Sequence, residues 1–201
     1  MREGKIEELR KLFKRCDYVM KTSELMREKI YYSDIQQCLK AGLIEKVKHG
    51  HYQWIHEHID SDIVLLNKLF PDVVFCMETA CFYYWYTDRT PAQWNFTIHR
   101  DVSKTRLNID YPFIKAYRSN LELLELGATN FTIDGVEVKM YDRDRTICDC
   151  LRHMNRMNKE TFNKVIQNYI KDPKKNIPNL IEYAKVLRVT KKVKDLIGMW
   201  L

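Results

Sequence analysis

The 201-residue sequence predicts an α+β protein built in two parts, and three patterns carry this prediction. Between residues 21 and 54, two helix-like segments separated by a turn precede two short alternating runs around His49-Gly50. Further along, an Asp134-Gly135 turn joins two more alternating runs, and helical periodicity dominates after residue 144. We therefore expect a winged helix-turn-helix at 1–56, and at 61–201 an α+β domain with a small, mostly antiparallel sheet and a helical tail.

The first part has the helix-helix-hairpin order of a winged helix-turn-helix. Thr22 or Ser23 can cap its second helix, and Gly42 can end the third. The Gly50 turn closes the hairpin, because glycine accepts the backbone conformation that tight turns require. The expected elements are helices at 4–16, 22–27 and 32–40, with a turn at 29–30, and strands at 43–47 and 52–55.

A polar segment at 56–61 breaks the periodicity and reads as a linker to the second part. Consecutive aromatics at 82–86 would cover every face of a helix, so most of them should be core; the alternative is base stacking. The expected elements are a helix at 62–70, an apolar run at 73–75, a buried helix at 77–86, strands at 94–99, 113–117, 131–133 and 136–140, and helices at 144–154, 159–171, 177–187 and 190–200.

The net charge of +7 and pI near 9.0 favour an anionic partner, but the charge is unevenly placed. Residues 1–60 carry 12 Lys or Arg against 10 Asp or Glu, residues 61–158 carry 12 against 13, and residues 159–201 carry 10 against 4. Most of the excess therefore lies in the tail, where a solvated face and an anionic contact are both open interpretations.

The six cysteines contain no C-x-x-C pair, so we expect buried free thiols in a reducing compartment. The first residues open an amphipathic helix in place of an apolar leader. No apolar stretch approaches the roughly 20 residues that span a bilayer. These features predict a cytoplasmic protein that has no membrane partner.

Polar residues on the outer face of the third helix are suited to reading DNA. Glutamine can pair with adenine through two hydrogen bonds, and lysine neutralises phosphates. The alternative is a protein-contact module whose polar face is solvated, since the first 60 residues carry a net charge of only +2. The expected DNA-contacting residues are Thr22, Ser33, Gln36, Gln37, Lys40, Lys46, Lys48, His49 and His51.

Two other clusters have structural and chemical interpretations. The histidines at 49, 51, 56 and 58 form two H-x-H pairs but lack a fourth ligand, so we expect no metal there. Asp142 and Asp144 are placed to cap a helix, and Arg145 and Asp149 to pair four residues apart, in an arginine-anchored domain junction. The alternative makes Asp142, Asp144 and Glu78 the metal ligands of a nuclease.

Three segments resemble the AbiEi antitoxins of bacterial AbiE abortive-infection (type IV toxin–antitoxin) systems. Residues 34–52, with the Gly42-Leu43-Ile44 to Gly50-His51-Tyr52 pattern, are similar to the winged helix and wing of that family. Glu78-Thr79-Ala80 followed by 88–91 resembles the start of its second domain, and residues 144–149 are similar to its E-R-T-L-x-D signature. The signature positions are Asp144, Arg145, Thr146 and Asp149, for which the resemblance suggests a structural role.

The resemblance implies a non-catalytic protein without a cofactor. Its winged helix would repress its own operon, and its second domain would counter a co-encoded nucleotidyltransferase-like toxin, directly or indirectly. The sequence departs from the family at three places: Asp144 stands where Glu is common, Cys148 is not a typical residue of the signature, and the wing tip has His49 and His51 in place of arginine. The two histidines weaken the expected contact between the wing and phosphates.

The primary hypothesis is thus a DNA-binding antitoxin and autorepressor that binds its own double-stranded operator, with two copies on repeated sites. The alternatives are a divalent-metal-dependent nuclease targeted by a winged helix, and a regulator whose aromatic second domain senses a small molecule.

Overall fold

The computed structural model describes residues 3–55 and 61–198. The chain divides into two compact units, Met1–Pro71 with Lys104–Pro112, and Asp72–Ser103 with Phe113–Leu201. The predicted boundary at 56–61 differs from this division, because helix 62–69 and segment 104–112 group with the first unit. A hydrogen bond from the Tyr111 hydroxyl to Asp62 (3.0 Å) joins these two segments. Within the predicted linker, residues 56–60 lie outside the described residues.

Among its described residues, the first unit contains three α-helices, a three-stranded antiparallel sheet in the order β1-β3-β2, a fourth α-helix and the 3₁₀ helix η1 (Lys104–Leu107). The elements are α1 (Glu3–Arg15), β1 (Val19–Lys21), α2 (Thr22–Arg27), α3 (Tyr32–Lys40), β2 (Ile44–Lys48), β3 (His51–Trp54) and α4 (Asp62–Leu69). The predicted helices and the β2–β3 hairpin are confirmed to within a residue or two. The sequence did not predict strand β1, because three residues are too few to show an alternating apolar pattern.

One apolar cluster holds α1, α2, α3 and the sheet together. Its fully or nearly fully buried members are Leu9, Phe13, Met20, Leu25, Ile35, Cys38, Ile44, Tyr52 and Trp54. The rings of Phe13 and Trp54 lie 5.6 Å apart, so α1 packs directly on β3. The helical spacing of the apolar residues is therefore explained by burial of one face of each helix.

The start of α2 differs from the prediction. Lys21 is the N-cap, and its backbone N–H donates to the Glu24 carboxylate over 2.8 Å. Thr22 instead donates its hydroxyl (3.3 Å) and its backbone N–H (2.9 Å) to the carbonyl of Gly50. Thr22 thus ties α2 to the hairpin tip and does not cap the helix.

The second unit is built on a five-stranded mixed sheet in the order β6-β5-β4-β8-β7. Its strands are β4 (Val74–Phe75), β5 (Trp94–His99), β6 (Ile114–Ser119), β7 (Ala128–Ile133) and β8 (Val136–Tyr141). The expectation of a mostly antiparallel sheet was wrong, because β5–β6 and β4–β8 are parallel while β4–β5 and β7–β8 are antiparallel. The chain between β5 and β6, which includes the 3₁₀ helix η1 (Lys104–Leu107), is long enough for the crossover that a parallel pair requires.

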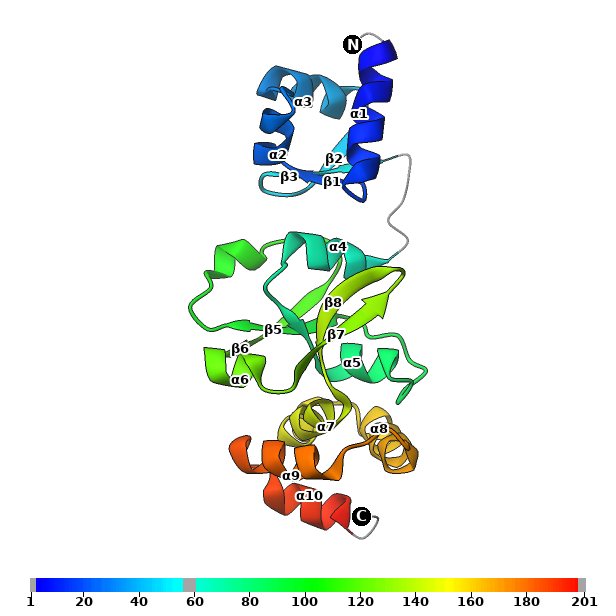
Figure 1. Cartoon of the computed structure of the whole chain (residues 1–201), viewed down its shortest axis with the longest axis vertical. Coiled ribbons are helices and arrows are strands. Elements are labelled where there is room, and N and C mark those ends of the chain that lie inside the picture. Colours follow the sequence, from blue (N-terminus) through cyan, green and yellow to red (C-terminus); the bar gives the residue numbers. More distant parts are fainter. Residues whose placement is uncertain (1–2, 56–60, 199–201) are drawn as a thin grey trace. The chain divides into compact units, whose positions relative to one another are not determined.

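Helix α7 lies at the centre of the helices of the second unit (Figure 1) and contacts α5, α8, α9 and α10. The helices are α5 (Met77–Tyr83), α6 (Leu121–Glu125), α7 (Arg143–Arg152), η2 (Met154–Arg156), α8 (Lys159–Lys171), α9 (Ile177–Val186) and α10 (Thr190–Leu196). The short α6 was missed, and the predicted helices ending at 154, 187 and 200 end earlier within the described residues. These differences fall at helix ends, where sequence patterns are least specific.

The aromatic run at 82–86 is only partly core. Tyr84 and Tyr86 are buried, and Phe82 and Tyr83 are half-buried. Trp85 is 82% exposed and has a positive φ of 60°, which ends α5 three residues before the predicted end. The expectation that most of these rings are core therefore holds only in part: two of the five are buried, two are half-buried, and the turn after α5 directs Trp85 outward.

All six cysteines are free thiols, as predicted, and all but the half-buried Cys16 are buried. In the part of the chain that the structure describes, none of the helices combines the length and apolarity needed to cross a bilayer.

Candidate functional site

The outer face of α3 gathers the polar residues that the sequence predicted. Ile35 and Cys38 face the core, whereas Ser33, Gln37 and Lys40 are exposed and Gln36 is half-buried. Residues three and four apart lie on one side of a helix, so these four side chains form one surface. We call Ser33, Gln36, Gln37 and Lys40 the α3 face.

Two tyrosines at the start of α3 extend this surface and were missed as site residues. Tyr31 is 60% exposed and Tyr32 is 63% exposed. Their place in the sequence could have indicated a role in the site, because Tyr31 and Tyr32 come directly before Ser33 at the N-terminal turn of the helix. They add two aromatic surfaces with hydroxyl groups to the N-terminal end of the α3 face.

The acid at this end of the helix is neutralised within the unit. Lys5 of α1 donates to the Asp34 carboxylate over 2.6 Å, and the Tyr31 backbone N–H donates to its other oxygen over 3.1 Å. The hydrogen bond from Lys5, followed by that from Tyr31, lowers the pKa of Asp34 below its usual range. Asp34 therefore ties α1 to α3 and does not repel an anion approaching the α3 face.

The β2–β3 hairpin lies beyond α3 in sequence and carries the second predicted group. Lys46 and His49 are exposed, and Lys48 is half-buried. The pairing shifts register between Lys46 and Lys48, a bulge that twists the strand near its tip. Gly50 adopts φ +71°, which fits the expected turn.

His51 is the predicted wing residue that turns inward. It is half-buried in the three-stranded sheet, where its Nδ1 lies 3.1 Å from the His49 carbonyl and its Nε2 is buried without a partner among the described residues. Burial lowers the pKa of His51, so its ring is held neutral near pH 7. Thr22 and His51 thus serve internal contacts, whereas Ser33, Gln37, Lys40, Lys46 and His49 present exposed side chains.

The signature arginine, Arg145, is buried and structural. Its Nε donates to Asp149 over 3.2 Å, and its Nη1 donates to the carbonyls of Leu123 (2.9 Å) and Leu126 (2.7 Å). Its guanidinium also lies 4.2 Å from the ring centre of Tyr141. The pair with Asp149 forms as expected, but every partner belongs to the second unit, so Arg145 anchors α6 to α7 and not one domain to the other.

The carboxylates of Asp142 and Asp144, which lie beside Arg145 in sequence, accept hydrogen bonds from groups of the second unit. Asp142 caps α7 by accepting from the Arg145 backbone N–H (2.7 Å), and its other oxygen accepts from the Tyr183 hydroxyl (2.9 Å). Asp144 accepts from the Tyr169 hydroxyl (2.8 Å) and from the backbone N–H of Asn176 (2.9 Å). Burial raises the pKa of both carboxyls. These contacts join α7 to α8 and α9.

The other signature residue, Thr146, donates its hydroxyl to the Tyr141 carbonyl over 3.3 Å. Glu78 has a buried Oε2 without a partner among the described residues. No group of three or more metal-binding side chains occurs within residues 3–55 and 61–198; His56 and His58 lie outside them. The contacts at Asp142 and Asp144 thus favour the structural interpretation of this cluster over the nuclease alternative.

Part of the basic tail has an internal role. Lys175 donates to the carbonyls of Ile170 (2.9 Å) and Asp172 (3.2 Å) at the end of α8, and Lys192 donates to the Leu151 carbonyl (2.7 Å) at the end of α7. Lysine at a helix C-terminus satisfies free carbonyls and complements the helix dipole. The exposed basic residues of the tail are Lys159, Lys164, Lys171, Lys174, Lys185, Arg188, Lys191 and Lys194.

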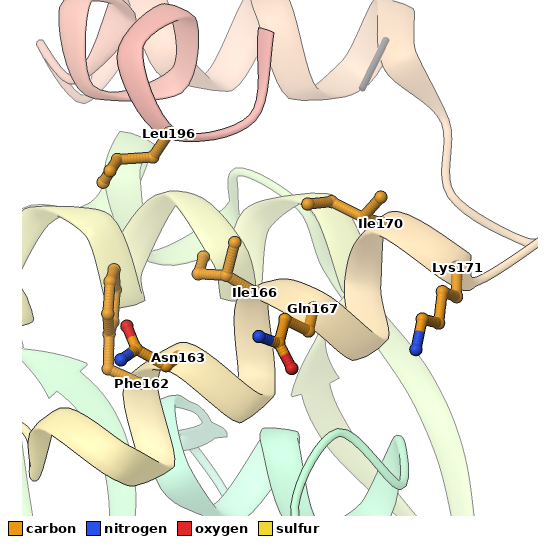
Figure 2. Close-up of a pocket in the computed structure, with 7 residues that line it drawn as sticks. All are labelled: Phe162, Asn163, Ile166, Gln167, Ile170, Lys171 and Leu196. Atoms are coloured by element: carbon orange, nitrogen blue, oxygen red, sulfur yellow. The ribbon is translucent and has the colours of Figure 1, made fainter. Parts of the chain in front are cut away.

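An apolar hollow of about 540 Å³ lies on α8, with Leu196 of α10 above it (Figure 2). Phe162, Ile166 and Ile170 supply its apolar surface, and Asn163, Gln167 and Lys171 also line it. Its lining residues include no carboxylate, histidine or cysteine, so it offers apolar contact and amide hydrogen bonds but no acid–base pair.

The comparison with known proteins supports the fold class alone. No family model matches the chain, and no curated protein matches its sequence. Among solved structures, the crystal structure of the RV2827C protein from Mycobacterium tuberculosis is similar, with a TM-score of 0.65 and 10% sequence identity. The match covers 84% of this chain and 66% of that one, just under two thirds of its length. The mixed α+β architecture is therefore shared with a known structure.

Proposed function

We propose that this chain is a DNA-binding antitoxin and transcriptional autorepressor of a bacterial toxin–antitoxin, abortive-infection operon, acting in the cytoplasm. The observation that carries the proposal is the α3 face beside the β2–β3 hairpin, together with the resemblance of residues 34–52 to the AbiEi winged helix. The element order, with α2 and α3 joined by a tight turn and followed by the hairpin, is the order expected of a winged helix-turn-helix and supports the proposal.

In this proposal α3 is the recognition helix. The N-terminal residues of such a helix reach base edges in the major groove, which makes Tyr32, Ser33, Gln36 and Gln37 the base-reading group. Gln36 and Gln37 can each pair with adenine through two hydrogen bonds. Two copies would bind repeated half-sites of the protein's own operator.

The phosphate contacts would come from Lys40 on α3 and from Lys46 and His49 on the hairpin. Lysine supplies affinity that is independent of sequence and falls steeply with salt. With a neutral His51 turned inward, the wing carries less charge than an arginine-rich one would. We therefore expect moderate affinity at physiological salt and a large gain at low salt.

The second unit would counter a co-encoded nucleotidyltransferase-like toxin, directly or indirectly. The residues of the signature are buried and hold α6, α7, α8 and α9 together, so their role is to maintain the shape that the partner meets. The proposal requires neither a cofactor nor a catalytic group.

A fluorescence-anisotropy titration of the full chain with its own upstream DNA tests the DNA-binding part. Lys46→Ala should weaken binding to specific and unrelated DNA alike and reduce the salt slope by about 1. Gln37→Ala should cost roughly 1–3 kcal/mol on the operator and little on unrelated DNA. Lys185→Ala, which removes an exposed charge from the second unit, is the matched control.

The absence of binding at low salt would overturn the proposal, since phosphate contacts are strongest there. An equal effect of Gln37→Ala on both DNAs would refute the assignment of the α3 face. Growth of cells that express the neighbouring toxin gene, with and without the full chain, tests the antitoxin part separately, because it does not depend on operator binding.

A further inference from the structure

A second hollow of the second unit, about 330 Å³ in volume, is lined by β6 and by the C-terminal end of α7 with η2. Strand β6 contributes Tyr117 and Arg118, and the helical side contributes Arg152, His153 and Arg156. The pair Arg145–Asp149 lines it as well. We call this hollow the arginine pocket.

The arginine pocket carries unbalanced positive charge. Arg145 and Asp149 pair at 3.2 Å, which leaves the exposed guanidinium groups of Arg118, Arg152 and Arg156. The carboxylate of Glu78 does not line the hollow, but its charge acts on Tyr117. Neither Arg152 nor Arg156 forms an ion pair within 4 Å in the described part of the chain, although the charge of Arg152 lowers the pKa of Asp149. Three arginines around one hollow repel one another, so a bound anion would stabilise the arrangement.

One of these arginines is held in place before any ligand arrives. The Arg118 Nη1 donates to the carbonyls of Arg100 (2.7 Å) and Val102 (2.5 Å). These bonds fix the side chain and leave its other N–H groups available, since a guanidinium has five donors. A preorganised guanidinium loses less conformational freedom when it binds an anion.

An aromatic pair forms another part of the lining. The rings of Tyr117 and His153 lie 5.2 Å apart, and the Tyr117 hydroxyl is buried without a partner among the described residues. A buried hydroxyl without a partner is costly, and a ligand acceptor would satisfy it. Burial lowers the pKa of His153, with further lowering from Arg152, Arg156, Lys115 and Lys192, so the same positive field acts on this ring.

We propose that the arginine pocket binds a small molecule carrying a phosphate monoester, with the phosphate between Arg152 and Arg156 and the organic group beside Tyr117 and His153. Arginine forms two parallel hydrogen bonds to phosphate oxygens, which a planar guanidinium matches in geometry. A hollow of this volume is at the size of small-ligand sites, and inorganic phosphate would leave most of it unfilled. The site goes beyond the proposed DNA-binding function and does not depend on it.

Isothermal titration of the full chain without DNA tests the site, with inorganic phosphate and the nucleotides AMP, CMP, GMP and UMP as probes. At least one nucleotide should bind saturably and more tightly than phosphate. Arg156→Ala should weaken binding about tenfold or more, because it removes a charge-assisted contact. Tyr117→Phe, which removes only the hydroxyl, should weaken it by about threefold to tenfold.

Arg188→Ala is the matched control, since Arg188 is exposed in the same unit and does not line the pocket. It should leave binding unchanged. An NMR titration of His153 supplies a second measurement, because a bound phosphate dianion should raise the pKa of this ring. The proposal is overturned if no nucleotide gives a saturable signal up to about 10 mM. It is also overturned if Arg188→Ala weakens binding as much as Arg156→Ala, which would indicate diffuse charge attraction.

Discussion

Replacing Arg145 with Met removes the central polar contact of the second unit. The side chain is 3% exposed, and its loss would leave the Asp149 carboxylate buried and unpaired. It would also leave the Leu126 carbonyl without the donor that the structure gives it, and the Leu123 carbonyl with the Tyr141 hydroxyl (3.3 Å) in place of two donors. Breaking a buried ion pair from one side costs about 3–5 kcal/mol, because the remaining charge is uncompensated.

That loss should lower the melting temperature of the second unit by about 10–20 °C, given the usual relation for a unit of this size. Differential scanning calorimetry of the full chain measures this change: the transition of the second unit should move to lower temperature, and the transition of the first unit should not move. Arg188→Met removes an exposed arginine from the same unit and should change the free energy of unfolding by less than about 0.5 kcal/mol.

The double variant with Asp149→Leu separates pairing from packing. Because Leu leaves no charge behind, adding it to Arg145→Met should recover at least about 1 kcal/mol. Burial already raises the pKa of Asp149, while Arg145 lowers it. Without Arg145 the folded carboxyl takes up a proton before the unfolded one, so the penalty should shrink as pH falls from 8 to 5. A loss below about 1 kcal/mol, or no recovery in the double variant, would refute this reasoning.

Three further changes test single features of the fold. Gly127→Ala should cost at least about 2 kcal/mol in thermal unfolding, because Gly127 has φ +72° and a Cβ there would lie 2.6 Å from the Arg145 Cβ. The control Gly135→Ala, at φ +78° with open space around it, should cost only the backbone strain of about 1 kcal/mol. The free energy of unfolding, measured with urea, should fall between pH 7.5 and 5.5, because the unfolded His51 ring, with a pKa near 6.5, protonates before the folded ring. His51→Gln should make this fall smaller, and an unchanged dependence on pH would contradict the burial argument. Asn158→Ala removes the acceptor for two N–H groups at the start of α8 and should cost about 1 kcal/mol by calorimetry, and no change would mean that water replaces the cap.

Local features were predictable from a few neighbouring residues. Asp134-Gly135 was expected to close a hairpin, and both residues have positive φ, at 50° and 78°. The cap at Asp142 and the pair of Arg145 with Asp149 followed from spacing on one helix. In each case the interacting groups are at most four residues apart, so the sequence itself brings them together.

Long-range features required the structure. The residues around Trp94 and Ile114 do not indicate that β5 and β6 run parallel, because the direction of a strand depends on the path of the chain between the two strands. The inward position of His51 depends on pairing with β1, a strand of three residues that sequence patterns do not reveal. The arginine pocket likewise joins β6 to the end of α7, which are separated in sequence by a hairpin and a helix.

The sequence by itself determined most of the helices, the hairpin turns, the polar face of α3 and the uneven distribution of charge. The tertiary structure decided the strand order, the internal roles of Thr22 and His51, the burial of Arg145, and the grouping of arginines around one hollow. The physical reason is that turns, caps and helix faces depend on contacts within a few residues. Strand pairing and side-chain burial depend instead on which distant surfaces must exclude water together.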